Sequence, residues 1–459
     1  MFSCIKNNNI LFSSVNIPKR YLRCMYFSSF SRRMYSSTPE QTKYISKRTL
    51  TIIGLTTITG YGIYCYFYLH NNYPRSVSKP LRNALWQERK FKDFETSIRF
   101  YMDALEECKR LEMNKLSNEY TGVEIKMAEM YEKLNNLSEA NEIYLIILNR
   151  IYNTLSTDSN AGQHNDNTIE QSIRENLIKK DLSILNKIIS NQNLQNIKSN
   201  AIYNQQLDVI ETHLKLAENE VYRKNPDLQK IMQNDSDPSL LVKGNISSNK
   251  SNESERDLQI SINQSRLKQF SHVLSTFKEE YFVIRDLYTE TFLKKGNINQ
   301  AVESKLVTIG WMILTNMSQG QILLSQANLG SLLYMKAENI EAHILHVKEK
   351  CPEKPQLISE MEQNRLFTIN MATRYYENVI YNAKSGKDTN SIQSMDGTIS
   401  QAICLSIYGL GIINLHENRI PKAKRLLEES INLSKSIGFD ELYQESMLEY
   451  TKLKKLLEV

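Results

Sequence analysis

The chain has 459 residues with only 15 glycines and 9 prolines, which favours helices with short connections over folds rich in strands and tight turns. Hydrophobic residues make up 41% of the chain, so there is enough apolar material for a core and the protein is not wholly disordered. The net charge of +6 arises from the first 35 residues, so it does not indicate nucleic-acid binding by the rest of the chain.

The first 35 residues have the composition of a mitochondrial transit peptide. They are basic and rich in serine, and the first acidic residue is Glu40. The membrane potential pulls such positively charged segments into the matrix. The run RMYSS at residues 33–37 resembles a matrix-processing site. We therefore predict a transit peptide over residues 1–35 and a matrix-side linker over residues 36–48, with a disordered basic tail as the alternative.

Residues 49–69 predict a single membrane-spanning helix. The stretch TLTIIGLTTITGYGIYCYFYL has no charged residue. As a helix it would be roughly 31 Å long, about the thickness of the hydrocarbon core of a bilayer. A buried helix of a soluble protein is the alternative. The charges on either side of the span do not decide its orientation. A processing site near residue 35 makes the span a stop-transfer segment, with the N-terminus in the matrix and the C-terminal domain in the intermembrane space.

The region after the span carries the pattern of the tetratricopeptide repeat (TPR), which folds 34 residues into two antiparallel helices. Small residues let the two helices approach closely, and a turn residue separates them. The clearest match is IKMAEMYEKLNNLSEANEIYLIIL, where Ala128, Asn135 and Ala140 take these three roles. Four more matches bring the total to two good and three loose ones; they contain Leu85 and Ser97; Thr289, Gly296 and Ala301; Gly330 and Ala342; and Gly411, Asn418 and Ala423.

These features predict an all-α protein, a degenerate TPR-like solenoid of helical hairpins preceded by a single transmembrane helix. Repeats would occupy residues 75–150 and 257–440, and a capping helix at 441–459 would cover the last apolar face. Residues 151–256 are expected to hold long helices with Asn/Ser-rich inserts at 153–168 and 234–256, which are too polar to fold. An irregular helical bundle is the alternative.

The sequence shows no catalytic or metal-binding pattern. It lacks a phosphate-binding loop, a GxGxxG turn, and HExxH and GxSxG motifs. The cysteines after the span have no paired spacing, and His343 and His346 are better explained as surface residues than as metal ligands. We therefore expect a protein that is not an enzyme and that uses neither a cofactor nor a metal.

A TPR array binds peptide segments on the surface formed by the first helix of each repeat. Aligning the repeats assigns nine residues to this groove, three from each of three first helices. Their mixture of apolar and charged groups suits exposed hydrophobic segments with polar flanks. Solvated helix faces are the alternative. The nine residues are Arg82, Trp86, Arg89, Ile125, Glu129, Glu132, Asp286, Glu290 and Leu293.

Three segments of the chain carry a family resemblance. They are YPRSVSKPLRNALWQE at 73–88, YMDALEEC at 101–108 and SNEYTGVEIKMAEMYEKL at 117–134. After a leader and one span, they resemble the TPR-containing Mgr-family adaptor subunits of the fungal mitochondrial i-AAA protease complex. The resemblance implies an inner-membrane protein with its TPR domain in the intermembrane space. It also implies partnership with a second adaptor subunit and the protease hexamer.

The family resemblance further implies a role in mitochondrial protein quality control. The expected function is that of a non-catalytic adaptor whose TPR domain binds unfolded or misassembled membrane proteins and presents them to the i-AAA protease. The alternative is an inner-membrane TPR assembly factor for a respiratory-chain complex, because such proteins share the leader, the span and the repeats.

Overall fold

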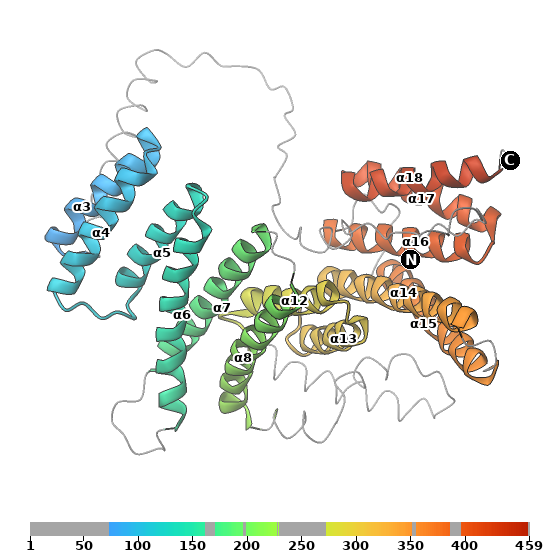
Figure 1. Cartoon of the computed structure of the whole chain (residues 1–459), viewed down its shortest axis with the longest axis horizontal. Coiled ribbons are helices and arrows are strands. Elements are labelled where there is room, and N and C mark those ends of the chain that lie inside the picture. Colours follow the sequence, from blue (N-terminus) through green and yellow to red (C-terminus); the bar gives the residue numbers. More distant parts are fainter. Residues whose placement is uncertain are drawn as a thin grey trace, which may run out of the picture. The chain divides into compact units, whose positions relative to one another are not determined.

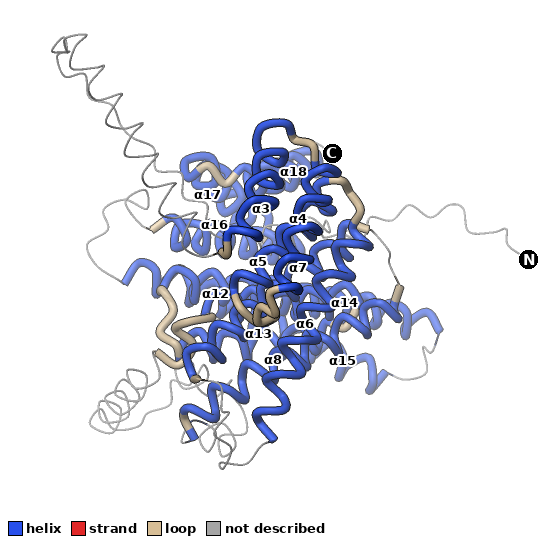
Figure 2. Tube along the Cα trace, turned by 90° about the vertical axis from the view of Figure 1, so that its left-hand side faces the viewer, coloured by secondary structure: helices blue, strands red, loops and turns tan. Residues whose placement is uncertain are grey.

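The computed structural model describes residues 73–160, 170–195, 199–226, 228, 272–350, 355–385 and 396–457. Every regular element within these ranges is a helix, as Figure 2 shows. The predicted all-α class is therefore confirmed. The predicted transit peptide (1–35), linker (36–48) and span (49–69) lie outside the described residues, as does the insert at 234–256.

The chain divides into two compact units, which we describe separately. The first unit extends from α3 through most of α8 and includes the first turns of α12. Consecutive helices from α3 to α7 pack against each other (Figure 1). The helices are α3 (Arg75–Trp86), the π-helix η1 (Gln87–Phe91), α4 (Phe94–Arg110), α5 (Asn118–Lys133), α6 (Leu137–Asn160), α7 (Gln171–Leu194) and α8 (Asn200–Lys224).

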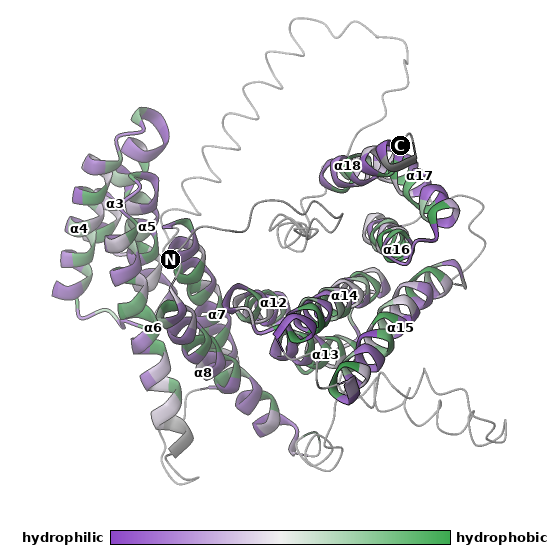
Figure 3. Cartoon of the chain, turned by 45° about the vertical axis from the view of Figure 1, so that its right-hand side comes forward, coloured by the Kyte–Doolittle hydropathy of each residue, from purple (hydrophilic) through white to green (hydrophobic). Residues whose placement is uncertain are grey.

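The second unit contains the rest of α12 and all later helices. Helix α14 packs against both α15 and α16, α16 packs against α17, and α17 packs against α18. Figure 3 shows hydrophobic and hydrophilic stretches on each helix, the pattern of amphipathic helices that bury one side. The helices are α12 (Lys278–Lys295), α13 (Ile298–Leu314), α14 (Gln319–Lys350), α15 (Pro355–Ser385), α16 (Gly397–His416), α17 (Ile420–Ile437) and α18 (Asp440–Leu457).

A recurring turn with a left-handed residue closes three of the hairpins. Asn135, Gly296 and Asn418 follow α5, α12 and α16 with φ angles of 62°, 85° and 60°. In each turn the next amide donates to the carbonyl five residues earlier, as Asn136 does to Tyr131 at 2.9 Å. Glycine and asparagine adopt positive φ at the lowest energetic cost. The three turn positions predicted from the sequence are therefore confirmed.

Pairs of small buried residues bring the two helices of a hairpin together. Gly411 shows why size matters, because a Cβ atom there would lie 3.1 Å from Cδ2 of Leu427 on α17. Larger side chains at such positions would force the helices apart. The pairs are twelve residues apart, and every member is buried: Ala128 with Ala140, Thr289 with Ala301, and Gly411 with Ala423.

Two segments differ from the sequence predictions. The pattern predicts a hairpin between Gly330 and Ala342, but both lie in α14, a single helix of 32 residues, and Ala342 is exposed. Helix α15 provides the partner instead. The pattern misled because small residues at helical spacing also occur within one long helix. Similarly, the expected insert at 153–168 begins as helix, since α6 continues to Asn160 and Leu155 is fully buried.

Helix α16 is the central helix of the core in the second unit. Within the described residues it is the one helix long and apolar enough to cross a membrane by length and composition. However, 78% of its apolar window is buried inside the protein, against α14, α15 and α17. Its hydrophobicity is therefore that of a core helix. The predicted span at 49–69 is a different segment, outside the described part of the chain.

Two buried pairs of polar side chains join α7 and α8. Nε of Arg174 lies 3.0 Å from Oε2 of Glu220, and their side chains are only 5% and 2% exposed. Nδ1 of His213 lies 2.7 Å from Oδ2 of Asp181, which is also buried. Burial raises the pKa of Asp181, although the bond with His213 opposes this effect. Such pairs contribute to stability only while both partners are present.

We expect Glu220→Gln to lower the free energy of unfolding by about 3–5 kcal/mol, because the buried guanidinium of Arg174 loses this carboxylate. The matched control is Glu211→Gln on the same helix, whose ion pair with Lys215 is 45% and 65% exposed. The control should change stability by less than about 1 kcal/mol. Denaturant unfolding followed by circular dichroism measures both, and equal losses would contradict the prediction.

Candidate binding surfaces

The first helices of successive hairpins in the first unit are bridged by ion pairs. Oε1 of Glu88, in the π-helix η1 that continues α3, accepts a hydrogen bond from Nζ of Lys133 on α5 at 2.7 Å. Oε2 of Glu132, at the end of α5, accepts one from Lys187 on α7 at 3.2 Å. Each glutamate therefore reaches a lysine of the next first helix. Glu88 and Glu132 occupy equivalent positions in two repeats.

This equivalence shifts the alignment of the first repeat by one residue. Glu88 follows the fully buried Ala84 by four residues, as Glu132 follows the fully buried Ala128. The hydroxyl of Ser97 on α4 donates to the carbonyl of Ala84 at 2.9 Å, so Ala84 is the small residue at the helix contact. It lies thirteen residues before Ser97, not twelve. The π-helix η1 accommodates the extra residue because its turn is wider than an α-turn.

The shift separates two sets of the residues predicted to line one groove. The set on α5 is Ile125, Glu129 and Glu132. Its counterparts in the first repeat are Leu81, Leu85 and Glu88. The predicted residues Arg82, Trp86 and Arg89 come one position later, which is about 100° around a helix. All three are exposed and present a different face.

The α5 set lies on the face of α5 beside its contacts with α7. Ile125 is partly exposed, and Glu129 forms an ion pair with Lys126 at 2.7 Å. Glu132 is fixed in place, because it accepts hydrogen bonds from Lys187 and, at 3.0 Å, from Asn191. An apolar residue and an acidic residue are therefore presented to solvent beside a structural glutamate.

The α12 set belongs to the second unit. Asp286 forms an ion pair at 2.7 Å with Lys305, whose side chain is only 3% exposed. Glu290 pairs with Lys294 at 3.0 Å, and Leu293 packs against the core. The nine predicted residues thus form three separate sets in two units.

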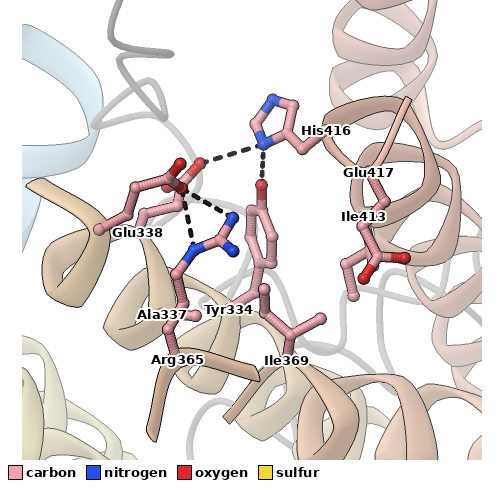
Figure 4. Close-up of a pocket in the computed structure, with 9 residues that line it drawn as sticks. Tyr334, Ala337, Glu338, Arg365, Ile369, Ile413, His416 and Glu417 are labelled. Atoms are coloured by element: carbon pink, nitrogen blue, oxygen red, sulfur yellow. Dashed lines mark hydrogen bonds and ion pairs between the residues drawn. The ribbon is translucent and has the colours of Figure 1, made fainter. Parts of the chain in front are cut away.

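A polar pocket that the sequence analysis did not identify opens between α14, α15 and α16 (Figure 4). The hydroxyl of Tyr334 is hydrogen-bonded to Nδ1 of His416, which lies 3.6 Å from Oε1 of Glu338. Arg365 pairs with Glu341 at 3.0 Å. Tyr334, Glu338 and Glu341 share one face of α14, but their partners are distant in sequence, so local spacing alone could not reveal the cluster.

Burial changes the acidity of this pocket. It raises the pKa of Glu338 to about 7, and the nearby Glu341 acts in the same direction. The pKa of His416 is lowered because its ring is partly removed from water. The pocket can therefore exchange a proton near neutral pH. Among the described residues, no group of three or more His, Cys, Asp or Glu side chains could hold a metal ion, and His343 and His346 are exposed.

The raised pKa of Glu338 predicts a pH-dependent stability. Because its pKa exceeds the ordinary value of 4.5, its contribution to the free energy of unfolding is fully present below pH 4.5 and is lost as the pH rises through about 7. The glutamine of the Glu338→Gln variant does not titrate. The free energy of unfolding of the variant, relative to that of the parent, should therefore rise by up to about 3 kcal/mol between acidic and mildly alkaline pH.

Denaturant midpoints measured on both sides of neutral pH test this expectation. The control Glu349→Gln changes an exposed residue near the end of the same helix, outside the pocket, and should change stability by less than about 0.5 kcal/mol. A pH-independent difference for Glu338→Gln would contradict the assignment.

Comparisons with known proteins identify relatives along most of the chain. A family model described as the MGR3 middle domain matches residues 166–317, which include α7, α8, α12, α13 and the two buried pairs that join α7 and α8. The chain is 32% identical over 455 residues to the mitochondrial inner membrane i-AAA protease supercomplex subunit MGR3 of Saccharomyces cerevisiae, covering 93% of this chain and 86% of that protein. It is 29% identical over 458 residues to the Protein MRG3-like of the same organism, covering 94% of this chain and 93% of the relative.

Proposed function

Because the chain belongs to the MGR3 family, we propose that it is a subunit of an i-AAA protease supercomplex in the mitochondrial inner membrane. The observation that carries the proposal is 32% identity over 93% of the chain to a relative with that name. The match covers 93% of the chain, so it includes most of both structural units. The family expected from the segments between residues 73 and 134 is confirmed.

The subunit acts as a scaffold and not as a catalyst. One relative is named as a subunit of a supercomplex, and neither the family model nor the names of the relatives indicate an enzyme family. The fold suits this role, because helical hairpins held by small-residue contacts and polar bridges form extended surfaces. The chain binds other proteins, and the bond cleavage belongs to the protease.

The predicted import and membrane segments complete the proposed arrangement. Residues 1–35 direct the chain to mitochondria, residues 36–48 lie on the matrix side, and residues 49–69 cross the inner membrane once. The folded helices then lie in the intermembrane space. The composition of these segments supports the proposal, together with the inner-membrane location in the name of the relative.

Unfolded or misassembled membrane proteins are the proposed clients. Ile125 and Glu129 on α5 form a partly exposed apolar and acidic face, with Glu132 held in place beside them. Such a face suits hydrophobic segments that carry polar flanks. The α12 set of Asp286, Glu290 and Leu293 is a second, separate candidate. Arg82, Trp86 and Arg89 face another direction and have a different role, considered below.

Affinity purification from detergent-solubilised mitochondria tests membership of the supercomplex. We expect an AAA protease hexamer and a second adaptor subunit to be retained on the tagged chain and identified by mass spectrometry. An untagged strain provides the control. Recovery of a stable respiratory-chain intermediate without the protease would favour the alternative, an assembly factor.

The α5 face is tested by Ile125→Glu. A buried charge opposes binding of an apolar segment, so photo-crosslinking to an unfolded membrane-protein client should fall by roughly tenfold, equivalent to about 1.4 kcal/mol. The matched control is Ile146→Glu on α6, where the side chain is 58% exposed and lies outside the proposed surface. Thermal melting confirms that both variants fold. Unchanged crosslinking of folded Ile125→Glu, or equal losses in both variants, would reject this surface.

A further inference from the structure

The first helical segment of the folded region carries an unusual concentration of exposed positive charge. The single acid between residues 75 and 92 is Glu88, which is turned inward toward Lys133 and Tyr101. Within the described part of the chain, none of the basic residues of this segment forms an ion pair with a carboxylate. The basic residues, all exposed, are Arg75, Lys79, Arg82, Arg89, Lys90 and Lys92.

Five of these cations lie on α3 and η1, and together with Trp86 and Phe91 they form what we call the basic stripe; Lys92 follows η1. Arg75, Lys79, Arg82 and Trp86 follow at spacings of four, three and four residues, so they share one side of the helix. The buried Val77 and Ala84 mark the opposite side, which packs against the rest of the unit. The basic stripe therefore points away from the protein core.

Two large aromatic side chains are exposed within the basic stripe. Trp86 is 55% exposed and Phe91 is 59% exposed. Nζ of Lys90 lies 4.5 Å from the centre of the Trp86 ring and 5.9 Å from that of Phe91. Exposed aromatic rings among lysines and arginines are typical of helices that lie in a membrane interface, where rings enter the headgroup region and cations meet anionic lipids.

The length of the chain keeps this face near the bilayer. The predicted span ends at Leu69 and the described structure begins at Tyr73, so three residues lie between them and the chain takes four Cα-to-Cα steps. Fully extended, they reach at most about 14 Å. The start of α3 must therefore lie close to the membrane surface, and α3 with η1 extends only about 25 Å further.

We propose that the basic stripe binds the anionic headgroups of the membrane in which the chain is anchored, with Trp86 and Phe91 inserted among them. The inference rests on the proposed membrane anchor. The chemistry of recognition is that of phosphate-bearing lipids at a negative surface, which attracts clustered lysines and arginines within a Debye length. This contact holds the first unit against the bilayer. The α5 face remains available to clients, because its equivalents on the first helix are one position away from the residues of the basic stripe.

The chain contains a natural reporter for this contact. Its two tryptophans are Trp86 and Trp311, and Trp311 is only 2% exposed. The full chain is reconstituted into vesicles of neutral phosphatidylcholine, or of the same lipid with anionic phosphatidylglycerol, each with brominated acyl chains that quench nearby tryptophan. The emission that is lost in Trp86→Phe identifies the signal of Trp86.

We expect several-fold stronger quenching of Trp86 in the anionic vesicles, and its loss at high salt. Charge reversal of the basic stripe by Arg82→Glu, Arg89→Glu and Lys90→Glu together should abolish the quenching. The matched control reverses three exposed cations of α17, Lys422→Glu, Lys424→Glu and Arg425→Glu, and should retain it. Circular dichroism verifies that both triple variants fold.

Three outcomes would overturn the inference. The first is that Trp86 is not quenched although the chain resists alkaline extraction. That result would show that the anchor is present and that the basic stripe does not contact lipid. The second is quenching that is equal in both lipids and unaffected by charge reversal. The third is protection of Trp86 only when the protease partner is added, which would assign the basic stripe to an acidic protein surface. Release of the chain by alkaline extraction would reject the anchor itself.

Discussion

The close contact of two helices at a pair of small buried residues is the interaction on which the other features depend. Ala128 with Ala140 and Gly411 with Ala423 allow this contact, and a left-handed asparagine turns the chain between the helices. Once a hairpin is closed, the orientation of every side chain on its first helix is determined by helical periodicity. The small buried residues therefore determine which side chains are exposed to a binding partner, although they do not contact the partner themselves.

The first repeat shows how sensitive the exposed face is to this contact. One extra residue, accommodated by η1, separates Ala84 from Ser97 by thirteen positions. The residues after Ala84 keep their bridges to α5 through Glu88, while Trp86 turns outward. A single inserted residue thus gives α3 and η1 two different faces. One face contacts α5 through Glu88, and the other is exposed and rich in cations. The proposed lipid contact and the proposed client surface can then coexist in one unit.

Charged groups inside the array add a second constraint. Arg174 with Glu220, in the region matched by the family model, holds α7 against α8 at a desolvation cost that hydrophobic packing would not incur. In the other unit, partial burial raises the pKa of Glu338 to about 7. Burial favours the neutral form of a carboxyl group unless a nearby cation compensates for the lost hydration.

Features that depend on residues close together in the chain were predictable without coordinates. The helical class, the turns at Asn135 and Asn418, and the small residues twelve positions apart follow from backbone preferences and helical spacing, which act over a few residues. The register of the first repeat and the continuity of α14 were not predictable. They depend on contacts between residues far apart, such as Glu88 with Lys133, and on α15 packing against α14. Local patterns tolerate a shift of one residue, but the packing of helices against each other does not.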